Sequence, residues 1–161
     1  MRNMTMKASV KWLDRVAFVG ESGSGHAMVI DGAPDAGGRN IGPRPLEAML
    51  IGLGACSAFD VVNILRKSRV KFSDCRVEIE AERADAIPAV FTRIHLTFIV
   101  SGRRIREQAV ERAVDLSASK YCSATAMLRE SVEITHEYRI EADPLEEIPD
   151  EERREEEKPD R

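Results

Sequence analysis

Residues 45–67 of this chain read PLEAMLIGLGACSAFDVVNILRK, and this stretch decides the fold. Proline is favoured in the first turn of a helix, and no other proline follows, so the stretch predicts one long helix that begins near Pro45. Up to Ala58 the helix is apolar on nearly every side, which indicates a buried helix rather than an amphipathic surface helix. Arg66 and Lys67 suit the negative C-terminal end of the helix dipole.

A helix that is apolar on all sides needs cover on all sides, and one small sheet cannot supply it. We therefore expect a second copy of the chain to complete the cover, which predicts an intimate homodimer. The apolar run itself, residues 46–58, is interrupted by Glu47 and is too short to span a bilayer. No membrane segment is expected.

Alternating apolar and polar residues on both sides of this helix indicate strands. The predicted strands are residues 6–13, 16–20, 26–30, 74–83, 90–100 and 132–141, and the predicted further helices are residues 104–116 and 121–129. Residues 31–45 are rich in glycine and proline and form a long loop, a kind of segment that often carries function. This order of elements predicts an α+β domain.

Charge separates a folded body from a tail. Residues 143–161 hold ten acids and four bases, a net charge of −6, whereas residues 1–142 are near neutral at +2. The sequence thus predicts a single domain over residues 1–142 and an acidic, disordered tail over residues 143–161. A near-neutral body carries no electrostatic footprint for nucleic acid. With no apolar signal segment and only three cysteines, the chain is expected in the cytoplasm.

Cys56 lies in the long helix among small residues. Gly52 and Gly54 cost the helix up to about 1 kcal/mol each, so a packed backbone or a substrate is expected to come close to them. The residues alone leave two alternatives for Cys56: an inert, small buried side chain, which they favour, or a reactive thiol. Cys75 lies on the apolar face of a predicted strand and is expected in the core.

Cys122 lies where the last short helix is expected to begin. A helix N-terminus lowers the pKa of a thiol, and Lys120 would add to the effect, although an inert cap cysteine is the alternative. There is no Cys-x-x-Cys motif. His26, His95 and His136 are isolated on separate predicted strands, so no metal site is expected.

Two groups of residues together resemble the OsmC/Ohr family. The first group surrounds the long helix and the second surrounds the last cysteine. They are Gly42-Pro43-Arg44-Pro45-Leu46-Glu47, Leu53-Gly54-Ala55-Cys56, Asp60-Val61-Val62, and Tyr121-Cys122-Ser123-Ala124-Thr125 with Leu128. The order of elements is similar over residues 5–140. The match is closer to the OsmC-related branch than to the organic hydroperoxide resistance proteins proper.

This resemblance implies antiparallel sheets packed around a cysteine-bearing helix, in an intertwined homodimer with two active sites at the interface. It also implies a thiol peroxidase that reduces small organic hydroperoxides. Cys56 would be the peroxidatic thiolate, which becomes a sulfenic acid, and Cys122 would be the resolving thiol, which forms a disulfide with it. An external dithiol, such as a lipoyl-linked one, would restore both thiols. No bound cofactor, metal or nucleic acid is expected.

Activation needs a cation, because a free thiol is mostly protonated at neutral pH. The family uses an arginine held by a glutamate, and we expect Arg39, in the glycine-rich loop, and Glu47 to fill these roles. Glu47 lies one residue later than the family motif places it. Nine residues of ideal helix turn through about 900°, so Glu47 and Cys56 are predicted on opposite helix faces. Glu47 would then act on an arginine of the partner chain or only favour the helix N-terminus.

Leu53, Asp60 and Tyr121 are expected to line the substrate site. Asp60 shares a helix face with Cys56, and an ionised carboxylate there opposes thiolate formation. Either Asp60 pairs with a cation, or this branch has a different mechanism. Three hypotheses follow: a hydroperoxide reductase; a redox sensor or small-ligand-binding dimer without turnover; and a structural dimer with both cysteines in its core.

Overall fold

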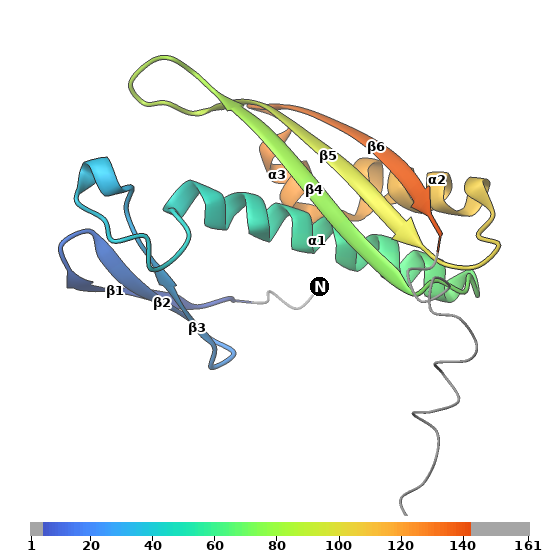
Figure 1. The fold of residues 1–161 in the computed structure, drawn as a ribbon, viewed down its shortest axis with the longest axis horizontal. Coiled ribbons are helices and arrows are strands. Elements are labelled where there is room, and N and C mark those ends of the chain that lie inside the picture. Colours follow the sequence, from blue (N-terminus) through green and yellow to red (C-terminus); the bar gives the residue numbers. More distant parts are fainter. Residues whose placement is uncertain (1–4, 143–161) are drawn as a thin grey trace, which may run out of the picture. The chain divides into compact units, whose positions relative to one another are not determined.

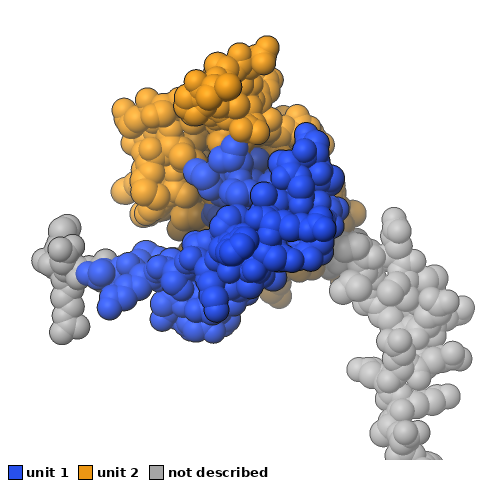
Figure 2. Space-filling model, turned by 90° about the vertical axis from the view of Figure 1, so that its left-hand side faces the viewer, with its two compact units in different colours: residues 1–52 blue, residues 53–161 orange. Residues whose placement is uncertain are grey.

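The computed structural model describes residues 5–142. Its described residues form two compact units, 5–52 and 53–142, which Figure 2 shows in different colours. The boundary between the units falls within the long helix. The predicted acidic tail, residues 143–161, lies outside the described residues, and the single domain predicted over residues 1–142 stays a prediction.

Figure 1 shows the elements in chain order. They are β1 (Ala8–Asp14), β2 (Ala17–Ser22), β3 (Ala27–Ile30), η1 (Pro34–Ala36), α1 (Pro45–Lys67), β4 (Asp74–Arg83), β5 (Phe91–Ser101), α2 (Glu107–Leu116), η2 (Ser117–Tyr121), α3 (Ser123–Leu128) and β6 (Glu133–Glu141). Each predicted strand and helix is present, with ends that shift by a few residues. The short turns η1 and η2 escape a sequence pattern because single turns have no period to detect.

The first three strands predicted from the sequence form an antiparallel sheet of order β1-β2-β3 in the first unit. Gly20 pairs with Val10 on one side and with Met28 on the other. Opposed residues share a face, and so do residues two apart along a strand, so Trp12 lies on the same face. Val10, Trp12 and Met28 are 68%, 62% and 43% exposed. This face of the sheet is therefore apolar but open within the described residues.

Asp31 organises the loop that follows β3. Its side chain is buried, at 1% exposure. Oδ1 accepts a hydrogen bond from the N–H of Gly32 at 2.8 Å, and Oδ2 accepts from the N–H groups of Arg39 at 2.8 Å and Ile41 at 3.3 Å. The N–H of Arg39 contributes most, and together these bonds outweigh burial and hold the pKa of the Asp31 carboxyl below its usual range. One ionised carboxylate thus fixes the course of the loop.

The second unit contains a sheet of order β4-β5-β6. β4 and β5 are antiparallel, and their register pairs Ile79 with Leu96 and Val77 with Phe98, which places apolar residues on one face. β6 pairs with β5 in parallel, so the expectation of purely antiparallel sheets is wrong for this strand. The physical reason is the connection: α2, η2 and α3 form a helical crossover that returns the chain to the same end of the sheet.

Helix α1 buries one face in the described structure. Leu53, Ser57, Val61 and Leu65 are all at most 1% exposed, and their spacing of four residues forms a single row. Phe59, in contrast, is 68% exposed. A helix buried on all sides is therefore not what one protomer shows, because a three-stranded sheet covers only one side of it. The open side is the part that the sequence assigned to a second copy of the chain.

The length of α1 corrects the argument against a membrane span. The whole helix has 23 residues, and its most apolar window has a mean hydropathy of 1.8, so by length and composition alone it could cross a membrane. The sequence argument considered only the shorter run 46–58. The core helix of a globular domain passes the same test, and the buried row of α1 is typical of such a helix.

Close packing explains one of the two glycines of α1. A Cβ atom at Gly54 would lie 2.6 Å from Cδ1 of Ile79, whereas a Cβ at Gly52 would meet nothing within 4 Å. The approach expected from the sequence is therefore that of a strand side chain to the helix at Gly54. Nothing in the described residues explains Gly52.

We predict that Asp31→Asn lowers the thermal unfolding midpoint. In the wild type, three N–H groups donate to the two carboxylate oxygens of Asp31. An asparagine amide has only one oxygen to accept these three hydrogen bonds. Because folding lowers the pKa of Asp31, its stabilising effect is present above the usual pKa of 3.8 and is lost as the pH falls below it. Unfolding midpoints measured across acid pH should therefore fall more steeply in the wild type than in Asp31→Asn. Equal slopes would contradict the assignment.

Candidate active site

Cys56 and Cys122 meet in the second unit, together with Asp60. The two Sγ atoms and a carboxylate oxygen of Asp60 all lie within 4.8 Å of one another. Cys56 and Asp60 stand one turn apart on α1, and Cys122 comes from the segment that joins η2 to α3. Residues far apart in the chain thus form one cluster, as the resemblance implied for the two cysteines.

The local fold around Cys122 exposes hydrogen-bond donors to its sulfur. The N–H of Cys122 donates to the carbonyl oxygen of Ser117 at 2.9 Å, which closes the π-helical turn η2. Such turns are rare and are often found at functional sites. The chain then begins α3, and Sγ of Cys122 accepts a hydrogen bond from the N–H of Thr125 at 3.4 Å. The sequence prediction that Cys122 begins the last helix is therefore confirmed.

Two serines connect α1 to this turn. The hydroxyl of Ser57 lies 3.1 Å from Sγ of Cys122. The hydroxyl of Ser117 donates to the carbonyl oxygen of Ser57 at 3.1 Å. Both serines are at most 1% exposed. Sequence reasoning missed Ser57 and Ser117, although the position of Ser57 directly after Cys56 was the one available signal.

The surroundings of Cys56 disfavour its thiolate. Burial raises the pKa of the Cys56 thiol most, and the neighbouring Cys122 and the Asp60 carboxylate raise it further, whereas the N–H of Ala124 acts in the opposite direction. Burial also raises the pKa of Asp60. None of these groups is a cation. The opposition between Asp60 and a Cys56 thiolate that the sequence predicts is therefore present in the structure.

Cys122 behaves differently. Burial raises its pKa, but hydrogen bonds from Ser57, from the side chain and N–H of Thr125, and from Cys56 outweigh that effect, and the pKa of the Cys122 thiol is lowered. Cys122 is only 2% exposed, while Cys56 is half-buried. In this conformation the more accessible sulfur is thus the less acidic one. Cys75, away from the pair, has its pKa raised to about 11 by burial and by Asp74.

The residues expected to activate the thiol are paired elsewhere in the first unit. Nη2 of Arg39 donates to Oδ1 of Asp14 at 2.7 Å. Oε2 of Glu47 accepts from the N–H of Arg44 at 2.9 Å, half of the reciprocal contact that caps a helix N-terminus. The structure therefore does not pair Arg39 with Glu47. The contact of Glu47 fits the alternative in which it favours the start of α1, and its catalytic role stays a prediction.

The expected substrate-lining residues have different environments. Asp60 is at the thiol pair, as described. Tyr121 ends η2, is 50% exposed, and has the ammonium of Lys120 5.4 Å from its ring centroid. Leu53 is 1% exposed and belongs to the buried row of α1, and its assignment to the substrate site stays a prediction. The spacing in the motif could not separate the core face of α1 from the cysteine face.

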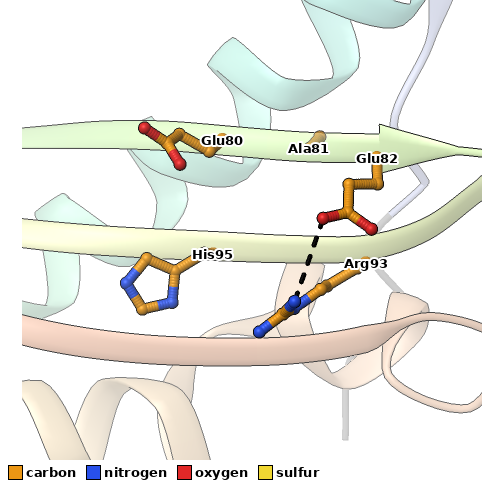
Figure 3. Close-up of a pocket in the computed structure, with 5 residues that line it drawn as sticks. All are labelled: Glu80, Ala81, Glu82, Arg93 and His95. Carbon is orange, nitrogen blue, oxygen red and sulfur yellow. Dashed lines mark ion pairs between the residues drawn. The ribbon is translucent and has the colours of Figure 1, made fainter.

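A polar pocket on the β4–β5 surface is a weaker candidate. Figure 3 shows Glu82 and Arg93 reaching toward each other across the two strands, and Nη1 of Arg93 lies 3.8 Å from Oε1 of Glu82. His95, on the same pocket wall, has Nδ1 2.7 Å from the hydroxyl of Thr135. Cross-strand pairs of this kind stabilise a sheet, so the polar side chains that line this pocket have a structural role. The thiol cluster is therefore the better site.

The match to a family decides the identity of the fold. Residues 37–137 match the family model described as OsmC-like protein. The chain belongs to the OsmC-like protein family. Protein YhfA of Escherichia coli (strain K12) is 48% identical over 137 residues, which cover 85% of this chain and 99% of that protein.

Solved structures agree with this OsmC-like assignment. The crystal structure of a hypothetical protein from Aquifex aeolicus VF5 has 27% identity and a TM-score of 0.72, and the match covers 86% of this chain and 98% of that one. An organic hydroperoxide resistance protein OsmC from Legionella pneumophila has the same fold at 15% identity, with a TM-score of 0.66 and the same coverage. The resemblance read from the motifs is confirmed at the level of the family.

We predict that the two thiols ionise in a fixed order. In a Cys75→Ser background, Cys56→Ser leaves only Cys122, which should titrate at lower pH than Cys56 does in the matching Cys122→Ser variant. Ultraviolet thiolate absorbance against pH measures both. Adding Ser57→Ala should raise the pKa of Cys122, because a donor to Sγ is lost, while Ser131→Ala at an exposed position should not. The reverse order of ionisation would contradict the environments described above.

Proposed function

We propose that this OsmC-like protein is a thiol-dependent reductase of organic hydroperoxides. The observation that carries the proposal is that the Cys56 and Cys122 sulfurs lie within 4.8 Å of each other. Cys56 is half-buried and Cys122 is buried. Family membership supports the same chemistry at a coarser level. Cys56 is the peroxidatic residue because its sulfur is the more accessible, and Cys122 is the resolving residue.

The reaction needs two nucleophilic steps. The Cys56 thiolate attacks the distal oxygen of the hydroperoxide, the O–O bond breaks, and the sulfur becomes a sulfenic acid while the alkoxide takes a proton and leaves as an alcohol. The Cys122 sulfur then attacks the Cys56 sulfur. An S–S bond forms, and the hydroxide that leaves is protonated to water. An external dithiol, such as a lipoyl-linked one, reduces the disulfide, and no bound cofactor is needed.

The opposite pKa directions keep the proton on Cys56 and the charge on Cys122, so transfer of the Cys56 proton to Cys122 is uphill and is driven by consumption of the Cys56 thiolate in its attack on the hydroperoxide. A Cys122 thiolate, stabilised by Ser57 and Thr125, accepts the proton of Cys56 and so generates the attacking thiolate only when a substrate is present. The same sulfur, reformed as a thiolate after the alkoxide is protonated, is the better nucleophile for the resolving step. In this proposal Cys122 supports both steps, and Arg39 is the candidate cation for the peroxide end.

A second candidate function has its own observation. Asp60 lies beside Cys56 without a cation among the groups that shift the Cys56 pKa, and slow thiolate formation suits a redox sensor better than an enzyme. Such a protein would oxidise slowly to the Cys56–Cys122 disulfide and would not turn over. Both proposals place the chain in the cytoplasm, where an unoxidised thiol pair is maintained.

We also propose a homodimer. In the first unit the apolar face with Val10, Trp12 and Met28 is open, and on α1 Ile51 and Phe59 are 57% and 68% exposed. Large apolar patches of this kind mark protein interfaces. A second copy of the chain is the occupant that the all-round apolar character of α1 requires, and an active site at this interface would gain residues from the partner.

For the peroxidase, Cys56→Ser should abolish reduction of cumene hydroperoxide with excess dithiol, because no sulfenic acid can form. Cys122→Ser should leave a sulfenic acid on Cys56 that a dimedone probe labels. Cys75→Ser should behave as the wild type, because that cysteine is outside the pair. A double Cys56/Cys122 serine variant that consumes hydroperoxide at the wild-type rate would exclude the proposal. Stoichiometric disulfide formation without turnover would favour the sensor.

For the homodimer, Val10→Glu should give a monomer in size-exclusion chromatography with light scattering, because it places a charge on the apolar face of the first sheet. Ser9→Glu is the matched control, since the neighbouring residue of β1 points to the opposite face. We expect this control to stay dimeric. A wild-type protein that is monomeric, or a Val10→Glu variant that stays dimeric, would contradict this interface.

A further inference from the structure

Three potential metal ligands converge in the second unit. Sγ of Cys56, Sγ of Cys122 and a carboxylate oxygen of Asp60 lie within 4.8 Å of one another. Among residues 5–142, Asp60 has no hydrogen bond or ion pair of its own. Three groups that become anionic therefore face one another without a counter-charge in the described protomer. A bound cation would reverse this repulsion.

We propose that Cys56, Asp60 and Cys122 bind Zn²⁺ when both cysteines are reduced. Two thiolates and one carboxylate carry three negative charges, which a divalent cation reduces to one. Thiolate ligands select soft or borderline ions, so Zn²⁺ is favoured over Mg²⁺ or Ca²⁺, which prefer sets of oxygen ligands.

The geometry suits a tetrahedral ion. Zn–S bonds of about 2.3 Å and Zn–O bonds of about 2.0–2.2 Å place the sulfurs about 3.8 Å apart and each sulfur about 3.5 Å from the oxygen. The observed limit of 4.8 Å is within one small side-chain adjustment of these values. Cys56 and Asp60 are four residues apart on α1, the spacing that lets two side chains of one helix hold one ion.

The surroundings of the three ligands resemble the outer shell of a thiolate–metal site. The N–H of Ala124 donates to Cys56, and the N–H of Thr125 donates to Cys122 at 3.4 Å. The hydroxyl of Ser57 lies 3.1 Å from the Cys122 sulfur. Such donors stabilise metal-bound thiolates and orient them. Three protein ligands leave a fourth position for water or an exogenous ligand, as in catalytic rather than structural zinc sites.

The metal site and the proposed disulfide compete for the same sulfurs. A Cys56–Cys122 disulfide removes both thiolates, so the oxidised protein has no site, and bound Zn²⁺ holds both sulfurs away from a hydroperoxide. Zinc would thus protect the pair or switch its reactivity off. Asp60, which opposes a simple peroxidase mechanism, has a direct role in this site. The sequence left two alternatives for Asp60: pairing with a cation or a different mechanism. In this proposal the cation is the metal ion.

The test uses reduced, metal-free, full-length protein under anaerobic conditions. Co²⁺ serves as a spectroscopic probe for Zn²⁺, and it should give a thiolate-to-cobalt charge-transfer band and the visible bands of tetrahedral coordination. Zn²⁺ should displace it at one equivalent per protomer. Cys56→Ser and Cys122→Ser should each lose most of the charge-transfer intensity. Asp60→Asn should weaken Zn²⁺ binding by at least about tenfold in competition with a chromophoric chelator.

Asp74 and Cys75, which are adjacent in the sequence and outside the cluster, supply matched controls. Asp74→Asn and Cys75→Ser make the same chemical changes at another Asp and another Cys of the same unit, and both should bind Co²⁺ and Zn²⁺ as the wild type does. Circular dichroism should show that every variant is folded. Absence of the charge-transfer band in the wild type would overturn the inference. So would unchanged affinity in Asp60→Asn, or an equal loss in Cys75→Ser.

The outcome is separable from that of the proposed function. Hydroperoxide reduction is measured with a chelator present, so turnover without any Zn²⁺ binding overturns the metal site alone. Stoichiometric Zn²⁺ binding without turnover overturns the peroxidase alone. Protein oxidised to the Cys56–Cys122 disulfide should bind no Co²⁺, and retained binding in that form would also overturn the assignment of both sulfurs as ligands.

Discussion

The buried row of helix α1 is the constraint on which the second unit depends. Leu53, Ser57, Val61 and Leu65 are spaced by four residues and are almost completely buried, so the rotation of the helix about its axis is fixed. That rotation leaves Cys56 and Asp60 at the margin of the row. Ser57 is the polar member of the row, and its hydroxyl and carbonyl oxygen are the atoms that meet Cys122 and Ser117. Ser57 therefore both packs in the core and contacts the sulfur of Cys122.

The surroundings of the two sulfurs shift their thiol pKa values in opposite directions. Cys122 receives hydrogen bonds that favour its thiolate, and Cys56 faces a carboxylate that disfavours its own. In the proposed reaction, uphill transfer of the Cys56 proton to the Cys122 thiolate supplies the reactive form of Cys56. A divalent cation at the same place reconciles it with Asp60. The two states exclude each other, because both use the same pair of sulfurs.

The sequence by itself located most of the strands and helices and identified the family. Alternating residues located the strands, the proline-started apolar run located α1, and the two cysteine motifs identified the OsmC-like family, which the family model confirms. The start of the last helix at Cys122 followed from the same pattern. These features are local: a period of two or of about 3.6 residues, or a short motif, is recorded in neighbouring positions of the chain.

Only the tertiary structure decided which residues meet. The parallel pairing of β6 with β5, the burial of Leu53 and the contact of Ser57 with Cys122 all join segments distant in the chain, and no local pattern records them. Arg39 was chosen for its place in the glycine-rich loop and Glu47 for its place near the family motif, yet they pair with Asp14 and Arg44. The sequence alone determined that this chain carries two cysteines in OsmC-like positions. The sequence also placed Asp60 on the helix face of Cys56, whereas the fold determined that Cys122 joins both, because the helical crossover brings its sulfur to that face.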